Sequence, residues 1–257
     1  IMKKLAGLAG AMAALGMTSA TMAHDFFLMP NQFTATQPGP LRLQASVGSS
    51  FPQPTTVVTP DRVEQLFVNG AGKPQIAIIG PGEKALNLQL TAEGAGTIVA
   101  GIKTLDRDVE YAEDRIPLIL EEYRVSPNAL AAVEKLEKPR TLKVSSRRFA
   151  KTMLCVRQCD ASGSAGRPMG VALEFIATGT SADHFRLLNL GQPLADYPVD
   201  LVNAEGKRAH LRTDSNGEVH IASEAKGSMM LFAAVMTPPA KAERFVLNLS
   251  TLTFSRP

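Results

Sequence analysis

The chain has 257 residues, with 27 Lys or Arg against 24 Asp or Glu, no Trp and 3 Tyr. Lys3 and Lys4 lie in an N-terminal segment that we expect to be removed, and 27 minus these two leaves 25 basic residues against 24 acidic ones. A protein so nearly neutral lacks the charge typical of nucleic-acid binding, so no nucleic-acid partner is expected. The scarcity of large aromatic rings also disfavours a stacking platform for sugars or bases.

The N-terminal segment has the pattern of a bacterial export signal. Residues 2–4 are Met-Lys-Lys, residues 5–17 form an apolar run, and small residues precede His24. We therefore predict a signal peptide over residues 1–23 and a periplasmic mature chain that begins at His24. Cleavage after Ala20 is the alternative. No later apolar run approaches the roughly 18 residues that a membrane span requires, so we expect no membrane insertion after the signal is removed.

A mature chain that begins at His24 would carry a metal-binding group at its first residue. The free amine and the imidazole Nδ1 of an N-terminal histidine can hold one ion together, which an internal histidine cannot do. Asp25 follows directly and is a candidate helper ligand. Amine and imidazole ligands suit Ni(II), Co(II), Cu(II) or Zn(II). The sequence predicts no organic cofactor.

The 234 residues that follow the predicted signal are enough for two units of about 100 residues each. We place an N-terminal β-rich domain over residues 24–140. Alternating apolar residues predict a strand at 41–47, and residues 64–68 and 75–79 are expected to form a hairpin around the turn 69–72. Two further strands are predicted at residues 84–90 and 97–105.

Residues 108–138 change character and predict a small helical insertion in this domain. Charged residues alternate with apolar ones over 110–124, and Pro117 indicates that the first helix is short or begins there. Ser126 followed by Pro127 is a typical helix start, with Ser as the N-cap and Pro at the first helical position.

The second predicted domain covers residues 141–257 and is again rich in strands. Several short strands separated by turn residues are typical of a β-sandwich. We expect strands at residues 171–177, 197–203, 209–213, 218–222, 229–236 and 245–254. The fold class is therefore mainly β, with two sandwich-like units and a small helical insertion.

Two histidines of the second domain are candidate metal ligands. If Leu211 and Val219 both face the core across the turn at 214–217, His210 and His220 point outward from one face of a hairpin. Cross-strand neighbours of this kind are close enough to share an ion. Two independently solvated histidines are the alternative. His184 is expected in a loop.

The two cysteines, Cys155 and Cys159, suggest a disulfide in an oxidising compartment. In one regular strand their Cα atoms would be about 13 Å apart, too far to bond, so a disulfide requires a turn between them. Two buried thiols or a thiolate metal site are the alternatives. No Gly-x-Ser-x-Gly nucleophile motif is present, and the adjacent acids Glu121 and Glu122 point apart on a helix, so we expect no enzyme activity.

Several short motifs along the predicted mature chain resemble the NikM-like family of secreted bacterial proteins, a domain of unknown function associated with nickel or cobalt uptake. The resemblance rests on residues 24–30 (HDFFLMP), 47–52 (VGSSFP), 148–151 (RFAK), 191–194 (GQPL), 213–217 (TDSNG) and 250–254 (STLTF). It implies a periplasmic accessory protein with His24 as a metal ligand. The later part also resembles transthyretin-like or immunoglobulin-like modules. Two histidines expected from the resemblance are absent. Ser49 and Ser50 stand after Gly48 where the first is expected, and Val235 stands before Met236 where the second is expected.

The leading hypothesis is a periplasmic protein that binds a transition metal through His24, helped by Asp25 or by His210 and His220. It would deliver or buffer the metal beside a metal-uptake transporter or an outer-membrane receptor. A metal-free interaction module that docks such an envelope partner is the second hypothesis. The third is a copper oxidase in which His24 and another histidine hold a redox copper.

Overall fold

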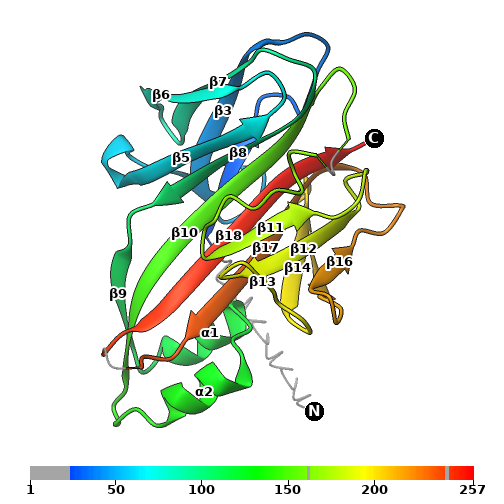
Figure 1. The fold of residues 1–257 in the computed structure, drawn as a ribbon. Coiled ribbons are helices and arrows are strands. Elements are labelled where there is room, and N and C mark those ends of the chain that lie inside the picture. Colours follow the sequence, from blue (N-terminus) through cyan, green and yellow to red (C-terminus); the bar gives the residue numbers. More distant parts are fainter. Residues whose placement is uncertain (1–23, 161–162, 241–242) are drawn as a thin grey trace, which may run out of the picture.

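The computed structural model describes residues 24–160, 163–240 and 243–257. The predicted signal peptide, residues 1–23, lies outside the described residues. The described residues are mainly β, and their strands form three sheets with two short α-helices at one end (Figure 1). A 3-10 helix, η1, covers Pro60–Arg62. The predicted fold class of sandwich-like β units with a small helical insertion is confirmed.

The N-terminal sheet has the strand order β1-β3-β7-β6, with the short β4 paired to β3. Its strands are β1 (Asp25–Pro30), β3 (Gly39–Gly48), β4 (Thr56–Val57), β6 (Gln75–Pro81) and β7 (Leu86–Ala92). In β3 the apolar residues alternate with polar ones, and Leu41, Leu43 and Ala45 are buried. The strand predicted at residues 41–47 is confirmed.

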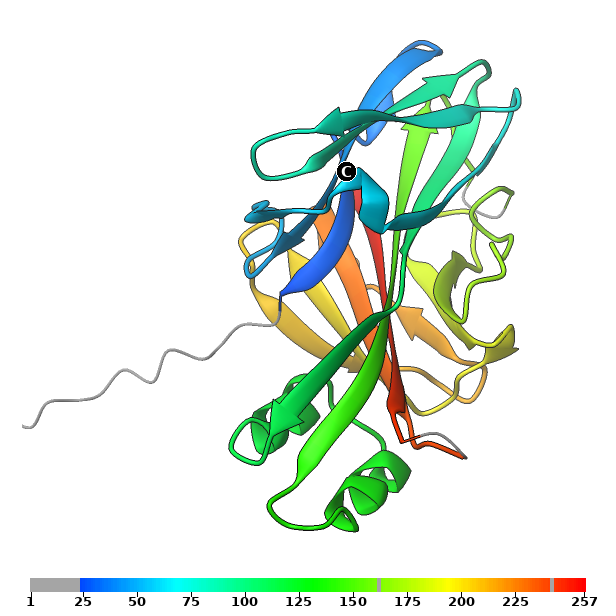
Figure 2. The same ribbon diagram turned by 90° about the vertical axis from the view of Figure 1, so that its left-hand side faces the viewer.

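The central sheet has the order β15-β14-β17-β18-β10-β8-β5, and β2 and β9 also pair with β10. Its strands are β2 (Thr34–Ala35), β5 (Val63–Gly70), β8 (Gly96–Thr104), β9 (Arg107–Ala112), β10 (Thr141–Val156), β14 (Pro198–Asn203), β15 (Arg208–Arg212), β17 (Gly227–Thr237) and β18 (Phe245–Arg256). The long strand β10 runs through the molecule beside β18 (Figure 2), and these two strands are parallel.

The C-terminal sheet has the order β11-β12-β13, with β16 paired to β12. Its strands are β11 (Leu173–Ala177), β12 (His184–Asn189), β13 (Gln192–Pro193) and β16 (Glu218–His220). This sheet packs against the central sheet, where Phe175, Phe185 and Val219 meet Leu231 and Phe254 in one core. The prediction of a C-terminal β-sandwich is confirmed.

Strand β10 serves two cores at once because its side chains alternate between its two faces. Phe149 and Met153 join the core under the C-terminal sheet. Ala150, Leu154 and Val156 join the core under the N-terminal sheet. The predicted domain boundary between residues 140 and 141 falls at the start of this strand, and the division into two domains stays a prediction.

The helical insertion is shorter than predicted. Residues 107–112 form strand β9 against β10, and the helices are α1 (Ile116–Glu122) and α2 (Pro127–Glu134). The Ser126 hydroxyl accepts a hydrogen bond from the backbone N–H of Ala129, as an N-cap does. Ile116, Ile119, Ala129 and Val133 pack against β10, β17 and β18, so the helices cover one end of the central sheet.

The predicted hairpin of residues 64–68 and 75–79 is wrong. Strand β5 pairs with β8 in the central sheet, whereas β6 pairs with β7 in the N-terminal sheet. Residues 71–74 therefore lead the chain from one layer of the sandwich to the other. A turn-rich sequence alone does not distinguish these two outcomes, because both require the same reversal of direction.

Candidate functional site

The site begins where the described chain begins, at the first residues of β1. His24 is exposed, and the next residue, Asp25, is 3% exposed. Asp25 pairs with Gly48 of β3, and the Thr251 hydroxyl of β18 donates a hydrogen bond of 2.7 Å to the carbonyl of Phe26. The start of β1 is thus held by a neighbouring strand and by a side chain from the sheet beneath it.

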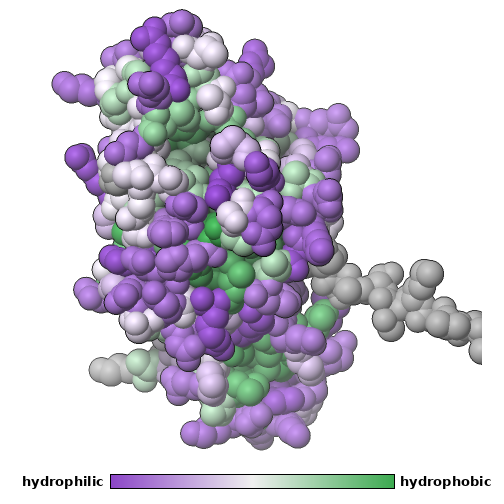
Figure 3. Space-filling model, turned by 90° about the vertical axis from the view of Figure 1, so that its right-hand side faces the viewer, coloured by the Kyte–Doolittle hydropathy of each residue, from purple (hydrophilic) through white to green (hydrophobic). Residues whose placement is uncertain are grey.

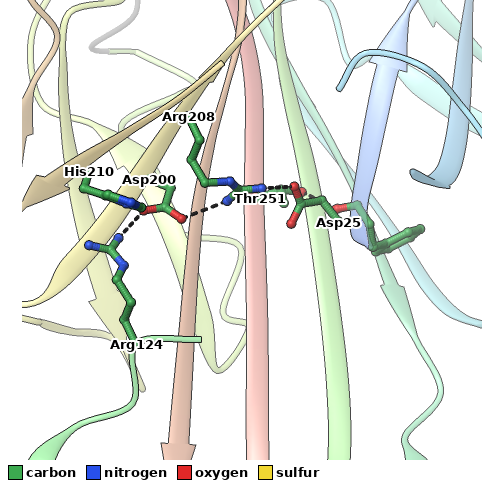
Figure 4. A network of polar contacts seen from close by, with 7 residues as sticks. Asp25, Arg124, Asp200, Arg208, His210 and Thr251 are labelled. Carbon is green, nitrogen blue, oxygen red and sulfur yellow. Dashed lines mark hydrogen bonds and ion pairs between the residues drawn. The ribbon is translucent and has the colours of Figure 1, made fainter. Parts of the chain in front are cut away.

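Asp25 belongs to a chain of charged side chains that runs across the central sheet (Figure 4). Its Oδ2 accepts from Arg208 Nη2, and Arg208 Nη1 donates to Asp200 Oδ2 over 2.8 Å. Asp200 Oδ1 meets both Arg124 and the Nδ1 of His210, the latter at 2.8 Å. We call these five residues the Asp25 network.

The hairpin of β14 and β15 places most of this network. Asp200 of β14 lies directly opposite His210 of β15, and Arg208 is two residues from His210 on the same strand. Residues two apart on a strand share a face, so both side chains reach the Asp200 carboxylate. The Asn203 side chain accepts hydrogen bonds from the backbone of Glu205 and Lys207, which turns the chain back at this point.

The Asp25 carboxyl has a hydrogen-bond partner for one of its two oxygens. Burial raises its pKa from the usual 3.8 to about 6, and the Arg208 guanidinium acts in the opposite direction without cancelling the effect. Its second oxygen, Oδ1, is buried and has no hydrogen-bond partner among the described residues. A buried carboxylate oxygen without a partner is costly, so it marks a position where a ligand or a proton would be favourable.

A small cavity adjoins His24 and Asp25. Tyr123, Arg148 and Thr251 also line it, and its volume of about 10 Å³ matches one water-sized occupant. An organic molecule does not fit into this space, whereas a single ion or water does.

His210 stands at the exposed end of the network, with 65% of its side chain accessible. Its Nδ1 contacts the Asp200 carboxylate at 2.8 Å. A histidine held by a carboxylate in this way is the usual form of a metal ligand. Figure 4 places His210 and Asp25 at opposite ends of the network, with Arg208 between them.

The predicted pairing of His210 with His220 is wrong. His210 lies in the central sheet on β15, whereas His220 lies in the C-terminal sheet on β16, opposite His184 of β12. His184 therefore begins a strand and is not in a loop as predicted. The turn at 214–217 carries the chain between layers, and Thr213 anchors it by accepting from the backbone N–H of Tyr197 and donating to the carbonyl of Leu194.

Ligand-type side chains gather closely at one other place. Among the residues that the structure describes, one group of three or more His, Cys, Asp or Glu has its ligand atoms within 4.8 Å of one another, namely Asp214, Glu218 and His220. The predicted set of His24, Asp25, His210 and His220 is thus divided between two places in the fold.

Cys155 and Cys159 form a disulfide, with their Cα atoms 5.6 Å apart. The chain turns directly after β10, where Arg157 has a positive φ of 65°. The required turn is present, and the alternatives of two buried thiols or a thiolate metal site are excluded.

Sequence reasoning missed Arg124, Asp200 and Arg208 as members of the site. One signal was available, because Asp200 interrupts the apolar run Val199–Val202 and is 2% exposed in the structure. A charged residue within such a strand indicates a buried partner. The identity of that partner depends on strand pairing and on the approach of α1, which the sequence pattern does not specify.

The fold and site define a β-sandwich protein whose first described strand begins with a buried carboxylate, one oxygen of which has no hydrogen-bond partner among the described residues. The chain belongs to the family described as a domain of unknown function, DUF4198, whose model matches residues 21–237. No curated protein matches it. None of the described helices has the length and apolar character needed to cross a membrane.

Two solved structures have low similarity to this chain. The D0-D1 domain of Intimin has 12% identity and a TM-score of 0.25, with 89% of this chain and 97% of that chain covered. The D00-D0 domain of Intimin has 12% identity and a TM-score of 0.21, with 90% of this chain and 100% of that chain covered. Similarity at this level carries no inference about function.

Proposed function

We propose that the mature protein is a non-enzymatic periplasmic accessory protein that binds a transition-metal ion at His24 and assists its uptake or homeostasis. Nickel, cobalt and copper are the proposed ions. The observation that carries this proposal is the buried, unpartnered Oδ1 of Asp25, directly after the exposed His24. The resemblance to the NikM-like family supports nickel or cobalt and suggests a metal-uptake transporter or an outer-membrane receptor as partner.

The proposal assigns a distinct role to each residue. After cleavage of residues 1–23, the amine and Nδ1 of His24 would grip the ion, and Asp25 Oδ1 would supply the third ligand. Asp25, rather than His210, is the helper because it adjoins His24 and lines the same small cavity. The ion would satisfy an oxygen that no described side chain satisfies.

The charges of the Asp25 network balance one another, and Arg148 adds one further positive charge at the cavity. Within the Asp25 network, the carboxylates of Asp25 and Asp200 face the guanidinium groups of Arg124 and Arg208, so the charged pairs balance. Arg148 lines the cavity, and its charge lowers the pKa of Asp25. It therefore opposes a metal ion and would favour an anion, which makes it a useful test position.

The first test compares two otherwise identical proteins, one that starts at His24 and one with a single glycine before His24. We expect calorimetry to show one equivalent of Ni(II) or Cu(II) bound at His24 in the first protein, with an affinity at least tenfold higher than the second protein shows at this position. The extra residue converts the terminal amine into an amide and so removes the bidentate grip. N-terminal sequencing of the exported protein establishes whether cleavage precedes His24.

Two variants then test whether Asp25 is the third ligand and whether the site prefers a cation or an anion. Asp25→Asn should weaken binding by about tenfold, and Arg148→Gln should strengthen it because a repelling charge is removed. Equal affinities for the two N-terminal forms would overturn the proposal. The metal-free interaction module would then be the better account, and weaker binding of an anion such as phosphate to Arg148→Gln would indicate an anion site instead.

A further inference from the structure

We infer that the C-terminal sheet carries a second metal site, formed by Asp214, Glu218 and His220 with His184 beside them. It is separate from the His24 site and does not depend on it, because His220 lies in the C-terminal sheet and Asp25 in the N-terminal sheet. The ligand is a divalent transition-metal ion of the zinc type.

The three core donors converge because of the local strand geometry. Val219 is buried, so its neighbours Glu218 and His220 both point away from the core on β16. Asp214 reaches the same face from the preceding turn, and one ligand atom from each of the three residues lies within 4.8 Å of the others. Figure 1 shows β16 beside β12 at the edge of the molecule, and the face on this side is largely hydrophilic (Figure 3). Asp214 and His220 are exposed, so solvent ions have access to them.

Asp214 is held in place before any ion arrives. Its Oδ1 accepts hydrogen bonds from the backbone N–H groups of Asn216, at 2.8 Å, and Glu218, at 2.9 Å. Two backbone donors on one oxygen leave Oδ2 as the ligand atom, and a ligand fixed in advance loses little freedom on binding.

His184 supplies a neighbouring second imidazole from another strand. It lies directly opposite His220 in the antiparallel pair of β12 and β16, and the two ring centroids are 4.2 Å apart. The three residues whose ligand atoms converge are one imidazole and two carboxylates, a set that zinc accepts with a fourth position open. His184 is the side chain next to that position. The pair of histidines is what distinguishes this place from an ordinary cluster of surface acids.

Arg186 is the competitor at this site. Its Nη2 donates to Glu218 Oε1 at 2.5 Å, directly opposite on the paired strand. An entering ion would have to draw Glu218 away from this arginine. The ion pair is partly exposed and therefore weak, so it lowers the metal affinity without preventing binding. This arrangement predicts that removing Arg186 strengthens metal binding.

The experiment uses the chain of residues 24–257 with His24→Ala, which removes the N-terminal chelate. Zn(II) is titrated by calorimetry, and Co(II) is used as a spectroscopic probe whose visible absorption reports nitrogen and oxygen ligation. We expect one equivalent of Zn(II), at least a tenfold loss of affinity with an added His220→Ala, a smaller loss with His184→Ala, and a several-fold gain with Arg186→Gln.

His210→Ala is the matched control, because His210 is also an exposed strand histidine beside a carboxylate but lies in the central sheet. It should leave the affinity unchanged. Absence of Zn(II) binding in the His24→Ala protein, or equal effects of His220→Ala and His210→Ala, would overturn the inference. Circular dichroism of each variant establishes that the fold is retained. Failure here would leave the His24 proposal untouched, since that proposal is tested by the N-terminal extension.

Discussion

The molecule contains two buried charge arrangements that differ in how completely they are satisfied. Lys151 Nζ donates to Glu174 Oε2 at 2.9 Å and to the carbonyl of Phe175 at 2.7 Å. Both Glu174 oxygens also accept backbone N–H groups, from Met169 and Gly170. The Asp25 network instead leaves Asp25 Oδ1 without a partner and extends to the exposed His210.

This difference separates a structural ion pair from a candidate site. Lys151 and Glu174 are 4% and 1% exposed in their side chains, and every contact joins β10 to β11 and the segment before it. Lys151 Nζ and both Glu174 oxygens have hydrogen-bond partners, so the pair joins the two sheets. Asp25 combines burial with an unused oxygen and an exposed histidine as its neighbour. Burial of charge alone therefore does not point to a site, whereas a buried carboxylate oxygen without a partner, directly after an exposed histidine, makes this place a candidate.

The largest expected effect on stability is at the buried ion pair of Lys151 and Glu174. Lys151→Met leaves the Glu174 carboxylate buried without its cation, and we expect the free energy of unfolding to fall by about 3–5 kcal/mol. Burial lowers the pKa of Lys151 while Glu174 opposes that shift, which shows that the two charges depend on each other. Urea unfolding measures the change. The double variant Lys151→Met with Glu174→Gln should recover part of the loss, and a fall below 1 kcal/mol in the single variant would contradict this assignment.

The next effect is the pH dependence that Asp25 imposes on stability. Its pKa is about 6 in the folded protein, against 3.8 as its usual value. The folded state therefore holds this proton more tightly than the unfolded state, so the Asp25 contribution is fully present below pH 4 and is lost as the pH rises through 6. The shift corresponds to about 3 kcal/mol.

Urea unfolding in EDTA at pH 4 and pH 6.5 tests this dependence, with Asp25→Asn as the reference. The wild-type protein should lose more stability than the variant over this interval. Parallel changes in the two proteins would show that Asp25 is not the group responsible.

The smallest effect is at the exposed end of the Asp25 network. His210→Ala removes a contact to Asp200 from a side chain that is 65% exposed, and Arg124 and Arg208 continue to satisfy that carboxylate. We expect a loss of about 0.5 kcal/mol, within the range of surface ion pairs. Thermal unfolding at pH 7 is sufficient to measure it. A loss above 2 kcal/mol would mean that His210 supports the network as strongly as the arginines do.

Much of the strand content followed from local patterns. Alternation in β3 and the apolar runs of β14, β17 and β18 predicted these strands, because a half-buried strand requires a period of two. The helix start at Ser126 followed from N-cap chemistry that acts within four residues. The disulfide was predicted as one of several options, and the turn that it needs lies within the same five residues.

The same local patterns did not predict which strands pair with each other. The turn before β6 and the turn at 214–217 both carry the chain to another layer, and the local sequence resembles that of a hairpin. No strand was predicted over residues 141–156, where the structure has β10. Polar residues interrupt the apolar pattern of this strand, yet Ser146, Lys151 and Thr152 are buried. These outcomes depend on which distant strand covers each face.

By itself, the sequence determined the β-rich class, the helical insertion and the candidate residues His24 and Asp25. Only the tertiary structure decided that Asp25 is buried against Arg208, that His210 joins its network through Asp200, and that His220 faces His184 instead. The physical reason is the separation along the sequence over which each kind of interaction acts. Strand period, capping and turn chemistry act over a few residues, whereas Asp25 and Arg208 are 183 residues apart and meet only because three sheets pack together.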